Sequence, residues 1–210
     1  RDLHSFPTRR SSDPDGSLYI SDTGNHTIRR LFRGVLSTIA GVAGDPGPTN
    51  GPARVARLNN PLGLAVMGPG ELVVADTGNH AIRRIGPTGD VTTIAGEPGE
   101  WGAVDGVGSA ARFYGPVGIT VAGNGDLLVS DSLNHAVRRV TAAGVVTTIA
   151  GKLGESGCTD GPGAVARFCN PAELQLDAYG RLYVVDAFNH LIRAVSTNGV
   201  VTTIAGRQGA

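Results

Sequence analysis

The chain has 210 residues, of which 40% are hydrophobic, and its 18 basic residues balance its 18 acidic ones. Zero net charge argues against the basic surface of a nucleic-acid binder or of a protein held on an anionic membrane. No apolar run approaches the roughly 20 residues of a membrane-spanning helix. The 32 glycines are typical of short strands joined by tight turns.

Residues 1–13, RDLHSFPTRRSSD, do not match the rest of the chain. The later repeats predict an apolar segment like ARLNNPLGLAV at this place, whereas arginines and serines stand here. The stretch resembles a translated sequencing adapter. We therefore expect residues 1–13 to lie outside the fold, and residues 14–210 to be a fragment whose true N-terminus is missing.

The remaining chain repeats itself at a fixed interval. The sequence TIAG recurs every 55 residues, and the Asn-His pair recurs at intervals of 54, 55 and 55 residues. The last residues of the TIAG copies are Gly41, Gly96, Gly151 and Gly206. The slip of one residue falls in the first unit, so one turn there differs in length.

Each full unit contains four short apolar runs separated by Gly, Pro, Asn or Asp, which predicts four strands. In the second unit they cover residues 62–66, 71–75, 81–85 and 91–95. No segment has the 3.6-residue period of a helix, so a β-propeller is favoured over a helical solenoid. The expected blades are 14–41, which lacks its opening strand, 56–96, 111–151 and 166–206. We expect an all-β fold of about four blades in an incomplete, open propeller.

The pattern NPLGLAV…GELVVADTGNHAIRRI…GDVTTIAG, from the second unit, resembles the NHL repeat. The Asn-His pair occurs four times and the full Asn-His-Leu triplet once, at residues 189–191. The resemblance covers residues 14–210. It implies a propeller, usually of six blades, with uses that range from protein and RNA binding to catalysis in a few relatives.

Three long connectors join the blades: connector 1 (residues 41–61), connector 2 (96–116) and connector 3 (151–171). In a four-stranded up-and-down blade, these connectors share one face with the turn between the second and third strands. Long connectors are more often functional than short turns. We therefore expect any bound protein or small ligand on this face.

The turn with the pattern Asp-x-x-Asn-His could be read as a metal or acid–base site. Zinc needs its ligand nitrogens about 2 Å from one ion, whereas equivalent residues of successive blades stand a blade width apart. Asp and Asn bond to turn amides and tolerate left-handed geometry, so a structural role is favoured. We expect each histidine to pack on its strand and bond to a neighbour. The residues are Asp22, Asn25, His26, Asp76, Asn79, His80, Asp131, Asn134, His135, Asp186, Asn189 and His190.

The third strand repeats a pair of arginines, at 29–30, 83–84 and 138–139, with Arg193 alone in the last unit. They could form a basic stripe for RNA, but the zero net charge favours ion pairs with the repeated aspartates. In the connectors, Asp105 and Asp160 could bind calcium. Calcium takes roughly six to eight oxygens, so turn formation is the better explanation.

Two further sets of residues occur in one repeat only. Cys158 and Cys169 both lie in connector 3, and their joint appearance leaves a disulfide, and with it an oxidising compartment, as an open alternative. Glu173 replaces the Gly63 and Gly118 of the earlier units, at the start of the innermost strand, and Gln175 stands nearby. These two side chains are candidates for contact with a ligand.

Two functions remain open. The first is a non-catalytic scaffold for protein or ligand binding, of bacterial origin and secreted or attached to the cell envelope. The second is a fragment of a propeller enzyme, a lyase or lactone hydrolase, whose active site is completed by missing blades. No nucleophile motif, phosphate loop or paired carboxylates appear, so neither catalytic residues nor a metal or cofactor are expected. Nucleic acid is disfavoured as a partner by the charge balance.

Overall fold

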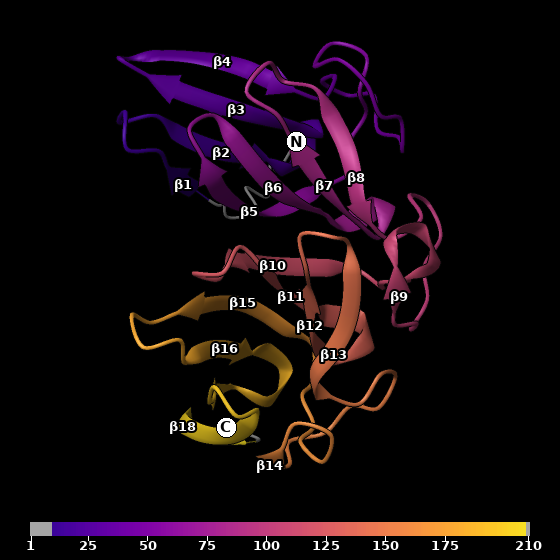
Figure 1. Cartoon of the computed structure of the whole chain (residues 1–210), viewed down its shortest axis with the longest axis vertical. Helices are drawn as coiled ribbons and strands as arrows, with labels where there is room; N and C mark the ends of the chain where they lie inside the picture. Colours follow the sequence, from indigo (N-terminus) through magenta and orange to yellow (C-terminus); the bar gives the residue numbers. More distant parts are fainter. Residues whose placement is uncertain (1–9, 209–210) are drawn as a thin grey trace, which may run out of the picture.

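The computed structural model describes residues 10–208, which form four antiparallel sheets. The sheets follow one another along an open arc, with the first at the top of Figure 1 and the fourth at the bottom. Helical structure within these residues is confined to five 3₁₀ turns, and none is a helix long and apolar enough to cross a membrane. The predicted all-β, open-propeller architecture is confirmed.

Each sheet is one blade, and its four main strands are paired in chain order. Blade 1 consists of β1 (Arg10–Ser12), β2 (Leu18–Asp22), β3 (Thr27–Phe32) and β4 (Val35–Ala40). Blade 2 consists of β5 (Pro61–Gly68), β6 (Glu71–Asp76), β7 (Ala81–Ile85) and β8 (Val91–Ala95). Blade 3 consists of β10 (Pro116–Val121), β11 (Leu127–Asp131), β12 (Ala136–Val140) and β13 (Val145–Gly151). Blade 4 consists of β15 (Pro171–Leu176), β16 (Leu182–Asp186), β17 (Leu191–Val195) and β18 (Val200–Gly206).

The expectation that residues 1–13 lie outside the fold is wrong for Arg10–Ser12. These residues form β1, which pairs with β2 and gives blade 1 its innermost strand. Strand pairing uses backbone donors and acceptors, so an unsuitable side-chain pattern does not prevent it. Asp13 is buried, and its carboxylate accepts a hydrogen bond from the amide of Gly70 in blade 2 at 2.9 Å. Residues 1–9 lie outside the described part of the chain.

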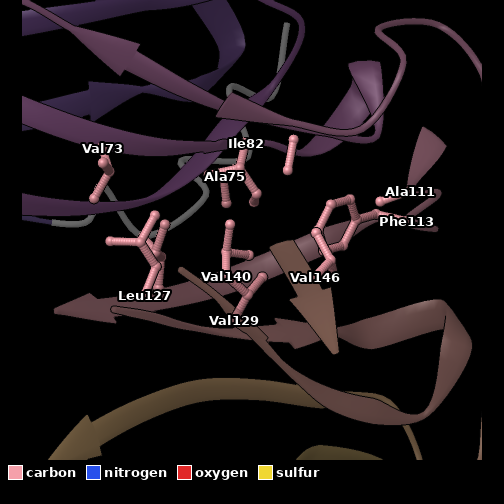
Figure 2. Close-up of a cluster of buried hydrophobic side chains, with 11 residues drawn as sticks. Val73, Ala75, Ile82, Ala111, Phe113, Leu127, Val129, Val140 and Val146 are labelled. Atoms are coloured by element: carbon pink, nitrogen blue, oxygen red, sulfur yellow. The ribbon is translucent and has the colours of Figure 1, made fainter. Parts of the chain in front are cut away.

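The hydrophobic core lies between the blades. Strands alternate their side chains between two faces, and each blade places small or branched residues on both. Figure 2 shows the layer between blades 2 and 3, where Ala75 and Ile82 of one blade lie opposite Val140 of the next and the ring of Phe113 lies to the right. The equivalent layer between blades 3 and 4 is built around Phe168. Two blades are therefore needed to bury each layer.

Each connector adds an edge to the blade that it leads into. In connector 2, β9 (Gly106–Val107) pairs with the outermost strand β13, and in connector 3, β14 (Gly161–Pro162) pairs with β18. Gly51 of connector 1 makes the same kind of bridge to Val91 of β8. The connector thus crosses from the outer edge of one blade to the outer edge of the next before it turns inward.

Candidate functional site

The connectors and the turns between the second and third strands lie on one face, as predicted. The 3₁₀ turns η1 (Thr23–Asn25), η2 (Thr77–Asn79), η4 (Ser132–Asn134) and η5 (Ala187–Asn189) occupy this position in the four blades. The amide of Gly99 in connector 2 donates to the carbonyl of Asn79 at 2.9 Å, and Gly44 and Gly154 make the same bond in connectors 1 and 3. We call this surface the connector face.

The Asp-x-x-Asn-His turn has one backbone geometry throughout. The histidine, and not the asparagine, takes the left-handed conformation, with φ between 56° and 58° in all four copies. Its amide closes the turn on the carbonyl three residues before it. The aspartate does not bond to the turn amides. The expectations that the aspartate bonds to these amides and that Asp or Asn takes the left-handed conformation are therefore wrong, although a structural role for the turn is supported.

The aspartate joins the turn to the connector that leads into its own blade. One carboxylate oxygen of Asp76 accepts the amide of Asn59 at 2.7 Å, and Asp131 and Asp186 hold Tyr114 and Cys169 in the same way. The other oxygen accepts bonds from the asparagine of the turn and from the arginine seven residues on. A single carboxylate therefore fixes a connector, a turn and a strand.

In blades 2 and 3 the asparagine ties two connectors to its turn. The side-chain amide of Asn79 donates to the carbonyl of Gly47 in connector 1 at 2.7 Å, while its backbone carbonyl accepts from Gly99 in connector 2. Asn134 repeats the first bond with Gly102 at 2.6 Å. The carboxamide is buried in both, which explains why this residue recurs without any ligand.

The histidine connects one blade to the next. Nδ1 of His80 accepts a hydrogen bond from the amide of Gly115 at 3.1 Å, and Nδ1 of His26 and His135 accept from Asn60 and Asn170 at 3.0 and 3.2 Å. The acceptor form of Nδ1 requires a neutral ring. The expectation that each histidine bonds to a neighbour is thus confirmed for three of the four copies.

Arg83, the first arginine of the pair in blade 2, and its counterparts Arg138 and Arg193 in blades 3 and 4 are buried beneath a connector. Arg138 is fully buried, donates to Asp131 at 2.6 Å and to Asp105 of connector 2 at 2.8 Å, and lies over the ring of Phe113. Arg193 makes the equivalent contacts with Asp186, Asp160 and Phe168. A shift of strand register before each of these arginines turns the side chain toward the connector. The predicted ion pairs with the aspartates are present.

Burial changes the proton affinity of these groups. Loss of solvent raises the pKa of Asp76 and Asp131 to about 6, against the opposing charges of Arg83 and Arg138 and the bonds to each carboxylate. Burial also lowers the pKa of His80 and His135. The rings of His80 and His135 are therefore held neutral at pH 7, as their bonds through Nδ1 require.

The two polar candidates of blade 4 lie on its innermost strand β15. Glu173 and Gln175 are exposed and border a shallow pocket with Tyr183 and Val185. In blades 2 and 3 the position of Glu173 is glycine, and a Cβ on Gly118 would lie 2.5 Å from the carbonyl oxygen of Ala172 in the following blade. Glu173 therefore stands where the earlier blades leave no room for a side chain.

Both cysteines of connector 3 are free and partly buried. The amide of Gly157 bonds to the carbonyl of Phe168, and that of Arg167 to Thr159. Cys158 thus lies opposite Arg167 and Phe168 where these two segments pair, whereas Cys169 follows Phe168 and is not opposite Cys158. The disulfide that the sequence left open is not formed. Within residues 10–208, no three His, Cys, Asp or Glu side chains gather into a group that could hold a metal ion.

The sequence analysis did not identify the large apolar side chains on the connector face. The middle residue of the 3₁₀ turn is glycine in blades 1 and 2 but Leu133 and Phe188 in blades 3 and 4, with exposed fractions of 42% and 69%. In connector 2, Trp101 is 64% exposed. Comparison of the aligned repeats could have found all three, because each is large where an equivalent residue is small.

The repeated unit is similar to a known sequence family. The sequence profile of the NHL repeat matches residues 58–85 and 113–139, which contain the second and third copies of the turn. The chain carries NHL repeats. The matched segments begin at a buried apolar residue of the connector and end in the strand of the buried arginine, so they include the pairs Asp76–Arg83 and Asp131–Arg138.

Related proteins place these NHL repeats in longer chains. The chain is 29% identical over 194 residues to protein SUPPRESSOR OF QUENCHING 1, chloroplastic, of Arabidopsis thaliana, a match that covers 86% of this chain and 18% of that protein. It is 31% identical over 139 residues to human NHL repeat-containing protein 2, covering 61% of this chain and 19% of that protein. The chain thus spans about a fifth of either relative.

The fold is also similar to a solved propeller. Virginiamycin B lyase from Staphylococcus aureus superposes with a TM-score of 0.64 at 16% sequence identity, covering 93% of this chain and 54% of the lyase chain. At this identity the likeness concerns the fold alone. The four blades of the NHL-repeat chain correspond to about half of that propeller.

Proposed function

We propose that the protein is a non-catalytic NHL-repeat scaffold that binds a protein or small ligand on its connector face. The observation that carries the proposal is the pair of side chains Leu133 and Phe188. They project from the same turn position that is glycine in blades 1 and 2, and both are exposed. Binding residues lie disproportionately on loops held by a rigid scaffold, and exposed apolar surface marks many interaction sites.

The framework beneath these side chains supports this role. The recurring aspartate, asparagine and arginine of the repeat bond to connectors and turns, and three histidines bond to the next blade. These polar groups therefore hold the connectors in fixed positions. A surface that is already rigid loses little conformational entropy when it binds.

The test is a selection of peptides from a displayed library against the full chain. We expect bound peptides to protect the turns η4 and η5 and the connectors from hydrogen exchange. The double variant Leu133→Gly, Phe188→Gly should lose binding, because it restores the residues of blades 1 and 2. Tyr179→Ala is the matched control, since Tyr179 is 90% exposed in the turn between β15 and β16, away from the connector face. Binding that survives the double variant and is lost in the control would place the surface on the opposite face.

The alternative function is a propeller enzyme, a lyase or lactone hydrolase, with further blades completing its site. The position of Glu173 and Gln175 on the innermost strand β15 favours it, together with the likeness of the fold to virginiamycin B lyase. Turnover of a lactone or of virginiamycin B that is abolished by Glu173→Gln, at unchanged thermal stability, would support this alternative over the scaffold.

A further inference from the structure

A short segment of connector 2 is fixed across two blades. The amide of Gly99 bonds to the turn of blade 2 through Asn79, at 2.9 Å, and the carbonyl of Gly102 accepts from the side chain of Asn134 in blade 3, at 2.6 Å. Trp101 lies between these two anchors. Its indole is therefore presented on the connector face from a rigid backbone.

Trp101 takes part in a stack of three rings. The indole stacks on Tyr114, with ring centroids 4.8 Å apart and planes inclined by 28°. The edge of the next ring, His80, meets Tyr114 at 5.6 Å. Although it is stacked, Trp101 remains 64% exposed, so one face of the stack is open to a partner.

The blade architecture does not require the aromatic pair. The repeat positions of Trp101 are Pro46 and Ser156, and those of Tyr114 are Asn59 and Cys169. Connectors 1 and 3 make the same backbone bonds to the turns without aromatic side chains. The stack is therefore an addition of connector 2.

The acidic residues beside Trp101 also differ from their counterparts. In connector 3, Lys152 pairs with Glu155, which also meets Arg167 at 3.3 Å. The corresponding residues of connector 2 are Glu97 and Glu100, whose backbones lie opposite each other. Two negative charges thus occupy the positions of an ion pair.

Among the described residues, no cation balances these two charges. Arg112, the counterpart of Arg167, donates instead to the carbonyls of Ser109 and Ala111. Within residues 10–208, neither Glu97 nor Glu100 forms an ion pair. Like charges held opposite each other cost stability, and a cation from outside would remove that cost.

We propose that Trp101, Tyr114, Glu97 and Glu100 bind an arginine side chain in an exposed segment of a partner protein. A guanidinium stacks on an aromatic face and donates to carboxylates in a planar fork, so it matches both features of the surface. The neutral ring of His80 adds no repulsion to such a cation. The inference rests on the proposed binding role of the connector face and names the chemistry of the partner.

The test uses the fluorescence of Trp101, which is the one tryptophan of the chain. The full chain is titrated with the peptide Gly-Arg-Gly-Arg-Gly and with the same peptide carrying citrulline in place of arginine. We expect a saturable change with arginine that weakens as salt is added, and none with citrulline, which keeps the shape but not the charge. Equal responses to the two peptides would overturn the proposal, as would no response at millimolar peptide.

Variants of connector 2 separate this inference from a general binding role. Glu97→Lys creates in connector 2 an ion pair with Glu100 that is equivalent to the Lys152–Glu155 pair of connector 3. We expect this variant to bind the arginine peptide at least tenfold more weakly, with an unchanged or higher Tm. Lys152→Glu, the reverse change in connector 3, should leave that binding unaltered. Undiminished binding by Glu97→Lys would contradict the inference. If arginine peptides fail while peptides dependent on Leu133 and Phe188 still bind, only this inference falls. Loss of both would remove the proposed function as well.

Discussion

His80 at the end of one turn accepts, through Nδ1, the amide of Gly115, which lies 35 residues further along the chain at the start of the next blade. This bond repeats from blade 1 to 2 and from blade 3 to 4. The residue that gives the repeat its second letter is therefore a contact between blades.

Replacement of His80 by alanine should lower the free energy of unfolding by about 2 kcal/mol. Alanine is strained in the left-handed conformation, and the amide of Gly115 loses its acceptor. Urea denaturation provides the measurement. His190→Ala is the matched control, because His190 has a φ of 57°, close to the 56° of His80, but, within residues 10–208, no following blade to bond. It should cost only about 1 kcal/mol for the strain. Equal losses in both variants would show that the bond to Gly115 contributes nothing.

The same bond predicts a dependence on pH. Burial lowers the pKa of His80 below its usual value near 6.5, so at lower pH the unfolded chain takes up its proton before the folded chain does. The stability from a neutral His80 is thus fully present above about pH 6.5 and is lost as the pH falls through that value. The difference in unfolding free energy between the natural chain and His80→Asn should shrink from pH 8 to pH 5.5. Asp76, whose pKa burial raises to about 6, is common to both proteins and cancels. A difference that grows on acidification would contradict this.

Asn50→Asp should stabilise the protein by about 1 kcal/mol. Arg138 and Arg193 each bond through Nε to a connector aspartate, but connector 1 has Asn50 there, and the buried Nε–H of Arg83 has no partner. A buried unpaired donor costs about 1–3 kcal/mol, of which an exposed carboxylate recovers a part. The reverse substitution Asp105→Asn should destabilise by a similar amount. Denaturant midpoints of the two variants that shift in the same direction would exclude this explanation.

Gly118→Ala should destabilise the protein by about 2–3 kcal/mol through overpacking. The new Cβ would lie 2.5 Å from the carbonyl oxygen of Ala172, so the inner strands of blades 3 and 4 would have to separate. Glu173→Ala, at the same repeat position in blade 4, should change stability by no more than about 0.5 kcal/mol, since the side chain is exposed. Thermal unfolding of the two variants is sufficient, and a tolerated Gly118→Ala would show that the strands can move apart at little cost.

The two cysteines should react as free thiols in the native protein without reductant. A colorimetric thiol titration is expected to find two groups, with Cys169 the slower, because burial raises the pKa of its thiol and reduces the reactive thiolate. Fewer than two groups in the native protein, rising to two after reduction, would indicate a disulfide.

The sequence was sufficient to predict the fold because the same pattern of strands, turns and polar residues occurs in every repeat. The four strands expected in the second unit coincide with β5 to β8 to within three residues at each end, and the pairing of Arg83 with Asp76 was expected from their recurrence. β1 was missed because it is held by backbone bonds, which leave no pattern in the side chains.

The contacts that build the candidate site were harder to predict. The partner of His80 lies in a connector of irregular structure, and no periodicity relates the two. Trp101, Leu133 and Phe188 were not predicted because they are not part of the repeated pattern: each replaces a small residue found at the same position of another repeat. Their exposure depends on how connectors cross the turns, which only the folded arrangement shows.

The pairing of β9 with β13 and of β14 with β18 shifts the boundaries of the cooperative unit. A blade that is defined as starting at its innermost strand lacks the incoming connector. This connector pairs with the outermost strand of the blade and covers its buried arginine. Excision or transplantation of a single blade should therefore cut just after the preceding TIAG sequence, so that the incoming connector travels with the sheet that it completes.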